Sequence, residues 1–275
     1  MYVTKANGKK ELFSEEKLAS SLVMAGADKE VSGAIAREVK SKIHDGITTD
    51  AIYSLALDIA HTAERRIATR YSVRRAIAEL GPTGFPFEKF VAEIFKAKGF
   101  QVLTDQIMHG ACTQHEVDVV AFNDKELIVV EVKFHNEVGI KSDLKVALYV
   151  KARHDDLKEV THMVAGKERA YTDGWLVTNT KFTQSAVEYA MCENLKLVGW
   201  NYPVKGNLED LIVEHSLYPI TCLSSLSTTQ KQALIAEGIT LVHQLQDQSI
   251  SLPENIISPE ELQHMRDEIT ILFSH

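Results

Sequence analysis

Residues 116–133 read EVDVVAFNDKELIVVEVK, and this stretch specifies the fold of the central part of the chain. Two valine-rich runs, 116–122 and 127–133, lie on either side of the turn-forming pair Asn123-Asp124. Runs of β-branched residues that end at such a turn favour strands. The stretch therefore predicts two short strands paired as a hairpin.

Three charged residues interrupt these apolar runs: Asp118, Glu131 and Lys133. Side chains alternate between the faces of a strand, so Glu131 and Lys133 point the same way, and Asp118 reaches the same point from the neighbouring strand. Three converging charges on an apolar hairpin are unfavourable without a cation, although a solvated edge would explain Glu131 or Lys133 alone. Two carboxylates and the carbonyl of Val132 suffice for Mg²⁺, with Mn²⁺ as the alternative, and Lys133 would orient a bound water or neutralise the phosphate.

The pattern resembles the PD-(D/E)XK restriction-endonuclease-like superfamily, in its Mrr-like branch, from Gly84 to Tyr202. The resemblance implies an α/β/α core with a mixed sheet, and Mg²⁺-dependent DNA cleavage that leaves a 5′ phosphate. Glu88 corresponds to a glutamate on the family's opening helix and is expected as a fourth catalytic residue; the alternative is a solvated first-turn glutamate. The proline of the family motif is absent, and His115 and Glu116 are either additional site residues or part of a polar loop.

The surrounding sequence follows the same order of elements. The expected elements are a helix over 85–95, a strand over 100–104, a helix over 143–164, a strand and loop over 174–180, a helix over 183–192 and a strand over 195–200. A local basic groove would serve DNA binding despite the acidic total charge. The candidates for this groove are Lys133, Lys145, Lys151 and Arg153.

Residues 1–82 form a separate predicted domain. Its expected elements are a hairpin that turns at Asn7-Gly8 and helices over 14–25, 30–43, 49–63 and 71–80. With motif residues in the hairpin, in 44–49 and in 71–76, this layout resembles the ATP-cone, a regulatory domain that binds ATP or dATP. By this resemblance the nucleotide would be bound by Val3, Lys5, Glu11, Lys17 and Thr49. Ala6 replaces a family arginine and removes one phosphate donor, and a solvated hairpin tip is the alternative for Lys5.

The predicted third segment, residues 205–275, is acidic and helical. It loosely resembles a helix-hairpin-helix module, with a helix over 228–237 followed by Gly238. Residues 201–275 hold three Lys or Arg against ten Asp or Glu, and therefore most of the net charge of −8. Because an acidic surface repels a polyanion, we expect this segment to serve packing or self-association instead of DNA contact.

Composition sets limits on the class of protein. A chain of 275 residues with 45% hydrophobic content has room for two or three domains, predicted here as 1–82, 83–204 and 205–275. Three widely separated cysteines suit reduced thiols better than a disulfide framework. Neither a signal peptide nor a long apolar run is present, so we expect a cytoplasmic protein without membrane contact.

These features together predict a Mg²⁺-dependent DNA endonuclease whose activity or assembly responds to ATP or dATP. The two resemblances also imply a homo-oligomer, because such nucleases commonly act as dimers that cut both strands and ATP-cones often govern the oligomeric state. A nucleotide-responsive regulator that binds DNA without cutting it is the first alternative. A structural assembly protein that binds neither metal nor nucleotide is the second.

Overall fold

The computed structural model describes residues 1–5, 8–25, 27–63, 65–81, 83–136, 139–246 and 257–273. Contacts between residues divide the chain into two compact units. The first unit comprises Met1–Ala76, Ile220–Ala233 and Gln248–His275, and the second comprises Ile77–Pro219 and Leu234–Asp247. The domain boundaries drawn from the sequence stay predictions. No helix among the described residues is long and apolar enough to cross a membrane.

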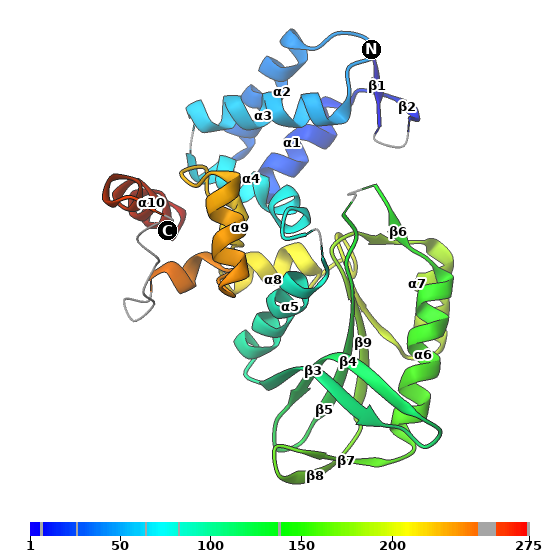
Figure 1. Ribbon diagram of the computed structural model, residues 1–275. Helices are drawn as coiled ribbons and strands as arrows, with labels where there is room; N and C mark the ends of the chain where they lie inside the picture. The colour runs from blue at the N-terminus through cyan, green and yellow to red at the C-terminus, as the bar shows by residue number, and fades with distance from the viewer. Residues whose placement is uncertain are drawn as a thin grey trace. The chain divides into compact units, whose positions relative to one another are not determined.

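The first unit begins with a β-hairpin followed by helices, as the sequence predicts (Figure 1). Its first elements are β1 (Tyr2–Thr4), β2 (Lys10–Leu12), α1 (Glu15–Met24), α2 (Lys29–Lys42), α3 (Thr49–Ala63) and most of α4 (Arg65–Ala78). The last of these helices begins at Arg65, earlier than the helix predicted over 71–80. The Ser14 hydroxyl accepts a hydrogen bond from the Lys17 N–H at 3.2 Å and caps α1. Of the predicted turn, Asn7 lies outside the described residues and Gly8 has φ 77°.

Two parts of the acidic C-terminal segment also belong to the first unit. They contain the short 3-10 helix η1 (Ile220–Cys222), most of α9 (Thr228–Ala236) and α10 (Pro259–Phe273). The buried Glu268 carboxylate accepts hydrogen bonds from the Ser224 N–H at 2.7 Å, the Ser224 hydroxyl at 2.8 Å and the Ser225 N–H at 2.8 Å. These bonds fasten α10 to the loop before α9.

The second unit is an α/β sandwich around a mixed five-stranded sheet of order β11-β9-β5-β4-β3. Its strands are β3 (Gln101–His109), β4 (Gln114–Phe122), β5 (Leu127–Lys133), β9 (Asp173–Thr178) and β11 (Lys196–Val198). β3, β4 and β5 pair antiparallel, whereas β9 pairs parallel to both β5 and β11. The predicted hairpin over 116–133 and the mixed sheet are thus confirmed.

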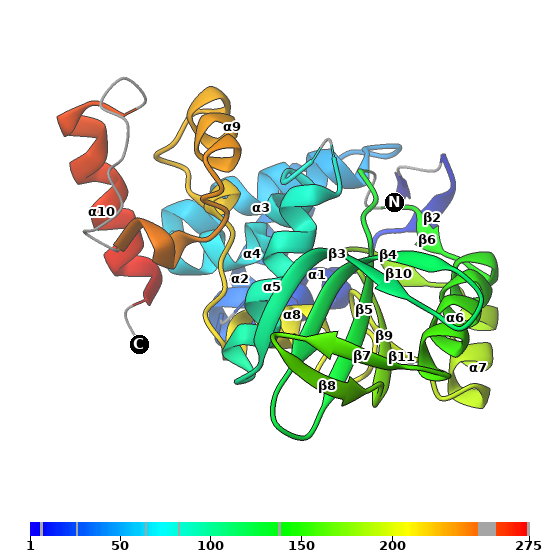
Figure 2. The ribbon, with the colours of Figure 1, turned by 60° about the horizontal axis from the view of Figure 1, so that its bottom comes forward.

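Helices cover both faces of this sheet (Figure 2). α5 (Phe85–Ala97) lies on one face and buries Phe87, Phe90 and Phe95. α6 (Leu144–Lys158) and α7 (Gln184–Cys192) pack on the other, where they share an apolar cluster with β9 and β11. The short parallel strands β6 (Lys141–Ser142) and β10 (Lys181–Phe182), the helix α8 (Leu208–Glu214) and the 3-10 helix η2 (Val242–Gln246) complete the unit.

The helix predicted over 143–164 is wrong at its C-terminal end. α6 ends at Lys158, and the chain then forms a hairpin of β7 (Thr161–Val164) and β8 (Lys167–Ala170). Ala165 and Gly166 between these strands have φ of 50° and 73°. Two consecutive residues with positive φ make the tight turn that suits the twist of a two-stranded ribbon, and they end any helical path.

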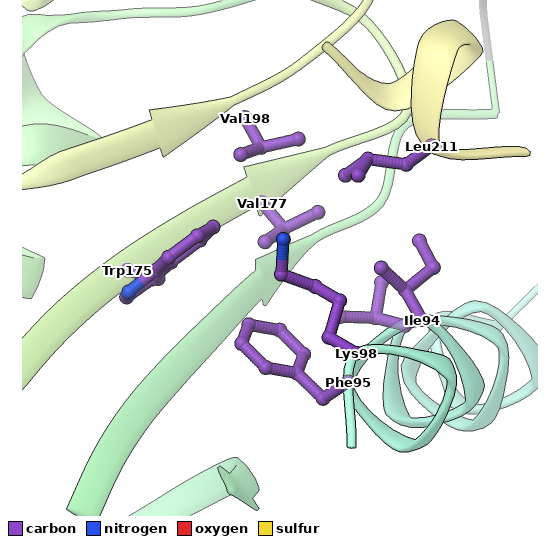
Figure 3. A pocket seen from close by; sticks show the side chains of 8 residues that line it. Ile94, Phe95, Lys98, Trp175, Val177, Val198 and Leu211 are labelled. Atoms are coloured by element: carbon purple, nitrogen blue, oxygen red, sulfur yellow. The ribbon is translucent and has the colours of Figure 1, made fainter. Parts of the chain in front are cut away.

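A small apolar pocket lies on the α5 face of the sheet (Figure 3). Its lining residues are Val91, Ile94, Phe95, Lys98, Trp175, Val177, Val198 and Leu211. Phe95 packs edge-on against Trp175 with ring centroids 5.3 Å apart, and the Lys98 ammonium lies 6.0 Å from the Trp175 ring centre. Because lysine is the only ionisable side chain in the lining, this pocket is a packing feature.

Candidate active site

The hairpin brings two carboxylates together where its strands separate. β4 pairs with β5 as far as Val119 opposite Val130, and continuing that register places Asp118 opposite Glu131. The parallel pairing of β5 with β9 continues beyond this point, as far as Lys133. All three charged residues predicted from the sequence therefore lie at this end of the sheet.

Asp118 is oriented by the backbone of the neighbouring strand. Its Oδ2 accepts a hydrogen bond from the Val132 N–H at 2.6 Å. No hydrogen bond from a described residue reaches Oδ1. Burial raises the pKa of Asp118, whereas the Val132 N–H and the Arg153 charge act to lower it. One oxygen is thus fixed, and the other is left for a ligand.

Glu131 is largely buried and pairs with Arg153 of α6. Its Oε2 accepts a hydrogen bond from Arg153 Nη1, and only 16% of its side chain is exposed. Burial raises the pKa of Glu131 to about 7, and the Asp118 charge adds to this effect. Arg153 and then Lys133 act in the opposite direction without restoring the ordinary value. The positive charges of Arg153 and Lys133 therefore do not fully compensate the buried carboxylate of Glu131.

Glu88 lies in the first turn of α5 and is half-buried. Burial raises its pKa to about 7, followed by the charges of Asp118, Asp105 and Glu116. Glu88 thus belongs electrostatically to the same carboxylate group, as the resemblance implies. Its catalytic role stays a prediction.

The residues present fit a hard divalent cation. Buried carboxylates that retain protons near neutral pH lack compensating charge, and a divalent cation would supply it. Within the described part of the chain, no three His, Cys, Asp or Glu side chains are placed to hold one metal ion. The predicted ligands include only two such side chains, Asp118 and Glu131, with the third oxygen from the Val132 backbone. Mg²⁺ commonly completes such a set with waters.

Lys133 is exposed on the same face as Glu131, and the backbone around it is held by buried polar groups. The Thr178 hydroxyl donates to the Lys133 carbonyl at 2.7 Å. Asn179 accepts from the His135 N–H at 2.8 Å and donates to the His135 carbonyl at 2.7 Å. Ser142 is hydrogen-bonded to both His135 and Thr178. This network fixes the chain that carries the lysine.

The predicted basic groove needs correction at two of its four residues. Lys151 forms ion pairs with Asp155 at 2.6 Å and Glu193 at 3.2 Å. Arg153 is engaged with Glu131, as described above. Both cations serve contacts within the protein, whereas Lys133 and Lys145 are exposed.

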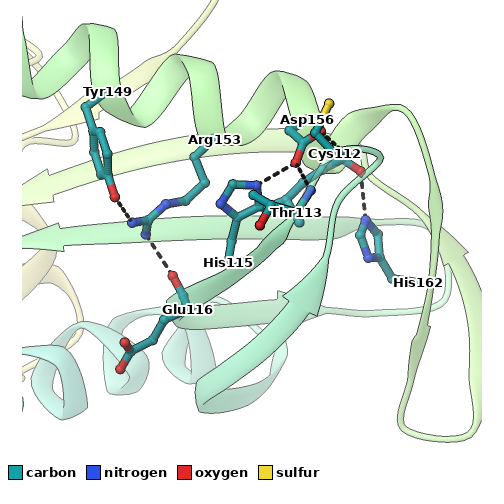
Figure 4. Close-up of polar contacts among 9 residues, drawn as sticks. Cys112, Thr113, His115, Glu116, Tyr149, Arg153, Asp156 and His162 are labelled. Atoms are coloured by element: carbon teal, nitrogen blue, oxygen red, sulfur yellow. Dashed lines mark hydrogen bonds and ion pairs between the residues drawn. The ribbon is translucent and has the colours of Figure 1, made fainter.

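Sequence reasoning missed the partnership between Arg153 and Glu131. The guanidinium also donates from Nη1 to the Glu116 carbonyl at 2.7 Å and from Nη2 to the Tyr149 hydroxyl at 2.8 Å (Figure 4). The i, i+4 spacing of Tyr149 and Arg153 was a signal for their own contact. No local pattern pointed to the strand on which the carboxylate lies.

His115 and Glu116, which stand before Asp118 where the family's proline is absent, lie in β4 and not in a polar loop, and their surroundings differ. His115 Nε2 lies 2.7 Å from the Asp156 carboxylate, which also accepts the Cys112 N–H at 2.7 Å (Figure 4). Asp156 therefore joins α6 to β4 through His115 and to the β3–β4 turn through Cys112. The Glu116 carboxylate is near enough to raise the pKa values of Asp118 and Glu88.

The five predicted nucleotide-binding residues lie on adjacent segments of the first unit. Val3 is buried and pairs with Glu11 across the hairpin. Glu11 forms ion pairs with Lys5 at 2.7 Å and Lys17 at 3.7 Å, and the Lys5 hydrogen bond is the main cause that lowers the pKa of Glu11. Thr49 begins α3, next to a residue that bridges β1. The structure brings these residues together, and nucleotide binding stays a prediction.

Comparison with known proteins matches three family models to successive parts of the chain. They are an ATP cone domain over residues 1–80, a restriction endonuclease over residues 81–201 and an AF1548-like C-terminal domain over residues 218–273. An uncharacterized protein of Archaeoglobus fulgidus is 39% identical over 133 residues, which are 48% of this chain and 71% of that protein.

Two solved structures are similar to the chain. The crystal structure of AF1548, a protein of unknown function, has a TM-score of 0.56 at 30% identity, and the match covers 68% of this chain and 99% of that one. The MspJI restriction endonuclease, in complex with a 27-mer oligonucleotide, has a TM-score of 0.37 at 12% identity, with 62% of this chain and 36% of that one covered.

Proposed function

The chain belongs to the family of AF1548-like proteins, with an ATP-cone domain and a restriction-endonuclease-like domain before the AF1548-like C-terminal domain, and on this basis we propose that it is a Mg²⁺-dependent DNA endonuclease. Activity would respond to ATP or dATP bound by the first unit. The fold supports a nuclease, and the chemistry of the site supports the metal.

The observation that carries the proposal is the group of acidic side chains at the separated ends of β4 and β5. Asp118 and Glu131 each have one oxygen engaged by the protein and one without a hydrogen bond from a described residue. Burial raises the pKa values of both carboxylates. Burying two carboxylates without a compensating charge destabilises the fold, so a purely structural role does not explain them. Raised pKa values of clustered carboxylates in one place are typical of functional sites.

Each residue has a distinct role in the proposed reaction. Asp118, Glu131 and the Val132 carbonyl would hold the cation, which when bound would lower the pKa of a water and neutralise charge on the phosphate. Lys133 would orient the attacking water through its ammonium. The water attacks phosphorus, the bond to the 3′ oxygen breaks, and the products carry a 5′ phosphate and a 3′ hydroxyl. Glu88 would accept a proton from the water or orient it.

The N-terminal unit supplies the proposed control. Lys5 and Lys17 point their ammonium groups at Glu11, and a triphosphate would compete with that carboxylate for both lysines. Hydrolysis of the nucleotide is not part of the proposal, because the sequence contains no Walker lysine motif.

Cleavage assays on linear, circular and branched DNA, with and without ATP, test this proposal. The native chain should cut at least one of these substrates in Mg²⁺ and not in EDTA, and ATP should change the rate. Asp118→Asn should bind no metal and cut none of them. DNA binding by the native chain without cleavage in Mg²⁺ or Mn²⁺ would contradict the nuclease and support the DNA-binding regulator.

A further inference from the structure

Arg153 is held in place by groups other than its carboxylate partner. Its Nη1 donates to the Glu116 carbonyl at 2.7 Å, its Nη2 donates to the Tyr149 hydroxyl at 2.8 Å, and only 12% of its side chain is exposed (Figure 4). The carbonyl belongs to β4 and the hydroxyl to α6. These two contacts hold the guanidinium in position independently of its ion pair with Glu131. A planar guanidinium suits this task, because its donors are arranged in a rigid fork.

This fixed guanidinium determines which oxygen of Glu131 remains for a ligand. Nη1 binds Oε2, and no hydrogen bond from a described residue reaches Oε1. The Val132 N–H does the same for Asp118, since it binds Oδ2 at 2.6 Å and leaves Oδ1. Each carboxylate therefore has one oxygen that accepts no hydrogen bond from a described residue and is the more available for a cation.

One-oxygen carboxylates favour small cations. Mg²⁺ requires near-octahedral geometry and retains waters, whereas Ca²⁺ takes six to eight oxygens and readily uses both oxygens of one carboxylate. The charged hydrogen bond from Arg153 to Oε2 disfavours the binding of one cation by both oxygens of Glu131. We propose that Arg153 is a positioning residue that makes Glu131 a one-oxygen ligand and thereby sets the preference of the site for Mg²⁺ over Ca²⁺. The inference rests on the metal site of the proposed function.

Two effects of Arg153 can be separated by substitution. Its positive charge repels any cation at the site, so Arg153→Met should tighten the binding of both metals. Its fork blocks Oε2, so the same substitution should favour Ca²⁺ more than Mg²⁺. Arg153→Lys keeps the charge, but one ammonium cannot reproduce the contacts with Glu116, Glu131 and Tyr149. Arg153→Lys should therefore lose the preference for Mg²⁺ over Ca²⁺, but it should not bind the two metals more tightly than the native chain does.

Isothermal titration calorimetry of the full chain with Mg²⁺ and with Ca²⁺, without DNA or nucleotide, tests the inference. We expect the ratio of the two dissociation constants to shift toward Ca²⁺ by about tenfold in both Arg153 variants, the size expected for one charge-assisted hydrogen bond. Lys158→Met, which removes an exposed cation from the same helix, is the matched control and should keep the native ratio. Tryptophan fluorescence verifies folding, and Tyr149→Phe provides a milder variant that should shift the ratio in the same direction.

The outcomes distinguish this inference from the proposed function. Metal binding that Asp118→Asn abolishes, together with an unchanged Mg²⁺ to Ca²⁺ ratio in Arg153→Met, Arg153→Lys and Tyr149→Phe, would overturn the role of Arg153 and leave the metal site intact. No metal binding by the native chain, or binding that survives Asp118→Asn, would overturn the metal site and the inference with it.

Discussion

Replacing Glu131 with glutamine should change how the stability of the metal-free protein depends on pH. Burial raises the pKa of Glu131 from 4.5 to about 7. Between these values the folded state binds a proton that the unfolded state has released, so the free energy of unfolding falls as pH rises through this window. At 1.36 kcal/mol per pKa unit, the loss attributable to Glu131 is about 3 kcal/mol as an upper value. The amide in Glu131→Gln does not titrate and still offers Arg153 an oxygen, so this variant should lack that part of the loss.

The assay uses the two tryptophans, Trp175 and Trp200, which both lie in the second unit. Urea unfolding followed by their fluorescence in EDTA, at about pH 5 and about pH 8, reports the stability of that unit. Adding about 10 mM Mg²⁺ at the higher pH should return about 1–2 kcal/mol to the native chain and nothing to Glu131→Gln. Equal pH dependence of the two proteins in EDTA would refute the claim that Glu131 is a buried carboxylate with insufficient positive charge.

Three further measurements test the nucleotide site, the C-terminal anchor and the metal ligand. Lys17→Ala should weaken ATP binding to the full chain by about tenfold in a calorimetric titration, because it removes one ammonium donor. The control Lys29→Ala, on the next helix, should bind ATP as the native chain does. Equal affinities of Lys17→Ala and the native chain would contradict the nucleotide site. Glu268→Gln should destabilise the first unit by about 1–3 kcal/mol, because an amide cannot accept all three hydrogen bonds of the carboxylate. Thermal unfolding followed by circular dichroism would measure this loss of stability. An unchanged melting curve would contradict the anchoring role of Glu268. At Mg²⁺ concentrations below saturation, cleavage by the native chain should rise with pH toward a plateau above about pH 7, because protons compete with the cation for Glu131. A flat rate from about pH 5 to pH 8 under these conditions would argue against Glu131 as a ligand.

The central hairpin was predictable because its signals are local. The strands follow from the valine-rich runs and the turn-forming pair between them. Glu131 and Lys133 are two positions apart, so they lie on the same face of their strand. Register then places Asp118 opposite Glu131 without further information. The cap at Ser14 was predictable for the same reason, since the side chain contacts the backbone only three residues away.

The features that the sequence analysis predicted wrongly or missed depend on contacts between residues distant in sequence or on overlooked backbone signals. Lys151 and Arg153 look alike in a helical sequence, and only the fold shows that one meets Glu193 and the other Glu131. The hairpin after α6 depends on positive φ at two residues, of which only Gly166 favours that conformation. α10 was missed although its start has a readable signal: Ser258 and Glu261 hydrogen-bond each other's backbone N–H groups as a capping box.

Single-turnover cleavage of a supercoiled plasmid by the native chain and by Lys133→Ala, each saturated with Mg²⁺, is the sharpest test of the proposed nuclease centre. We expect the substitution to lower the cleavage rate by at least about a hundredfold while Mg²⁺ affinity and the folding of the second unit stay close to native, and we expect native products to carry 5′ phosphates. Equal cleavage by the two proteins would contradict the assignment of Asp118, Glu131 and Lys133 as a nuclease centre.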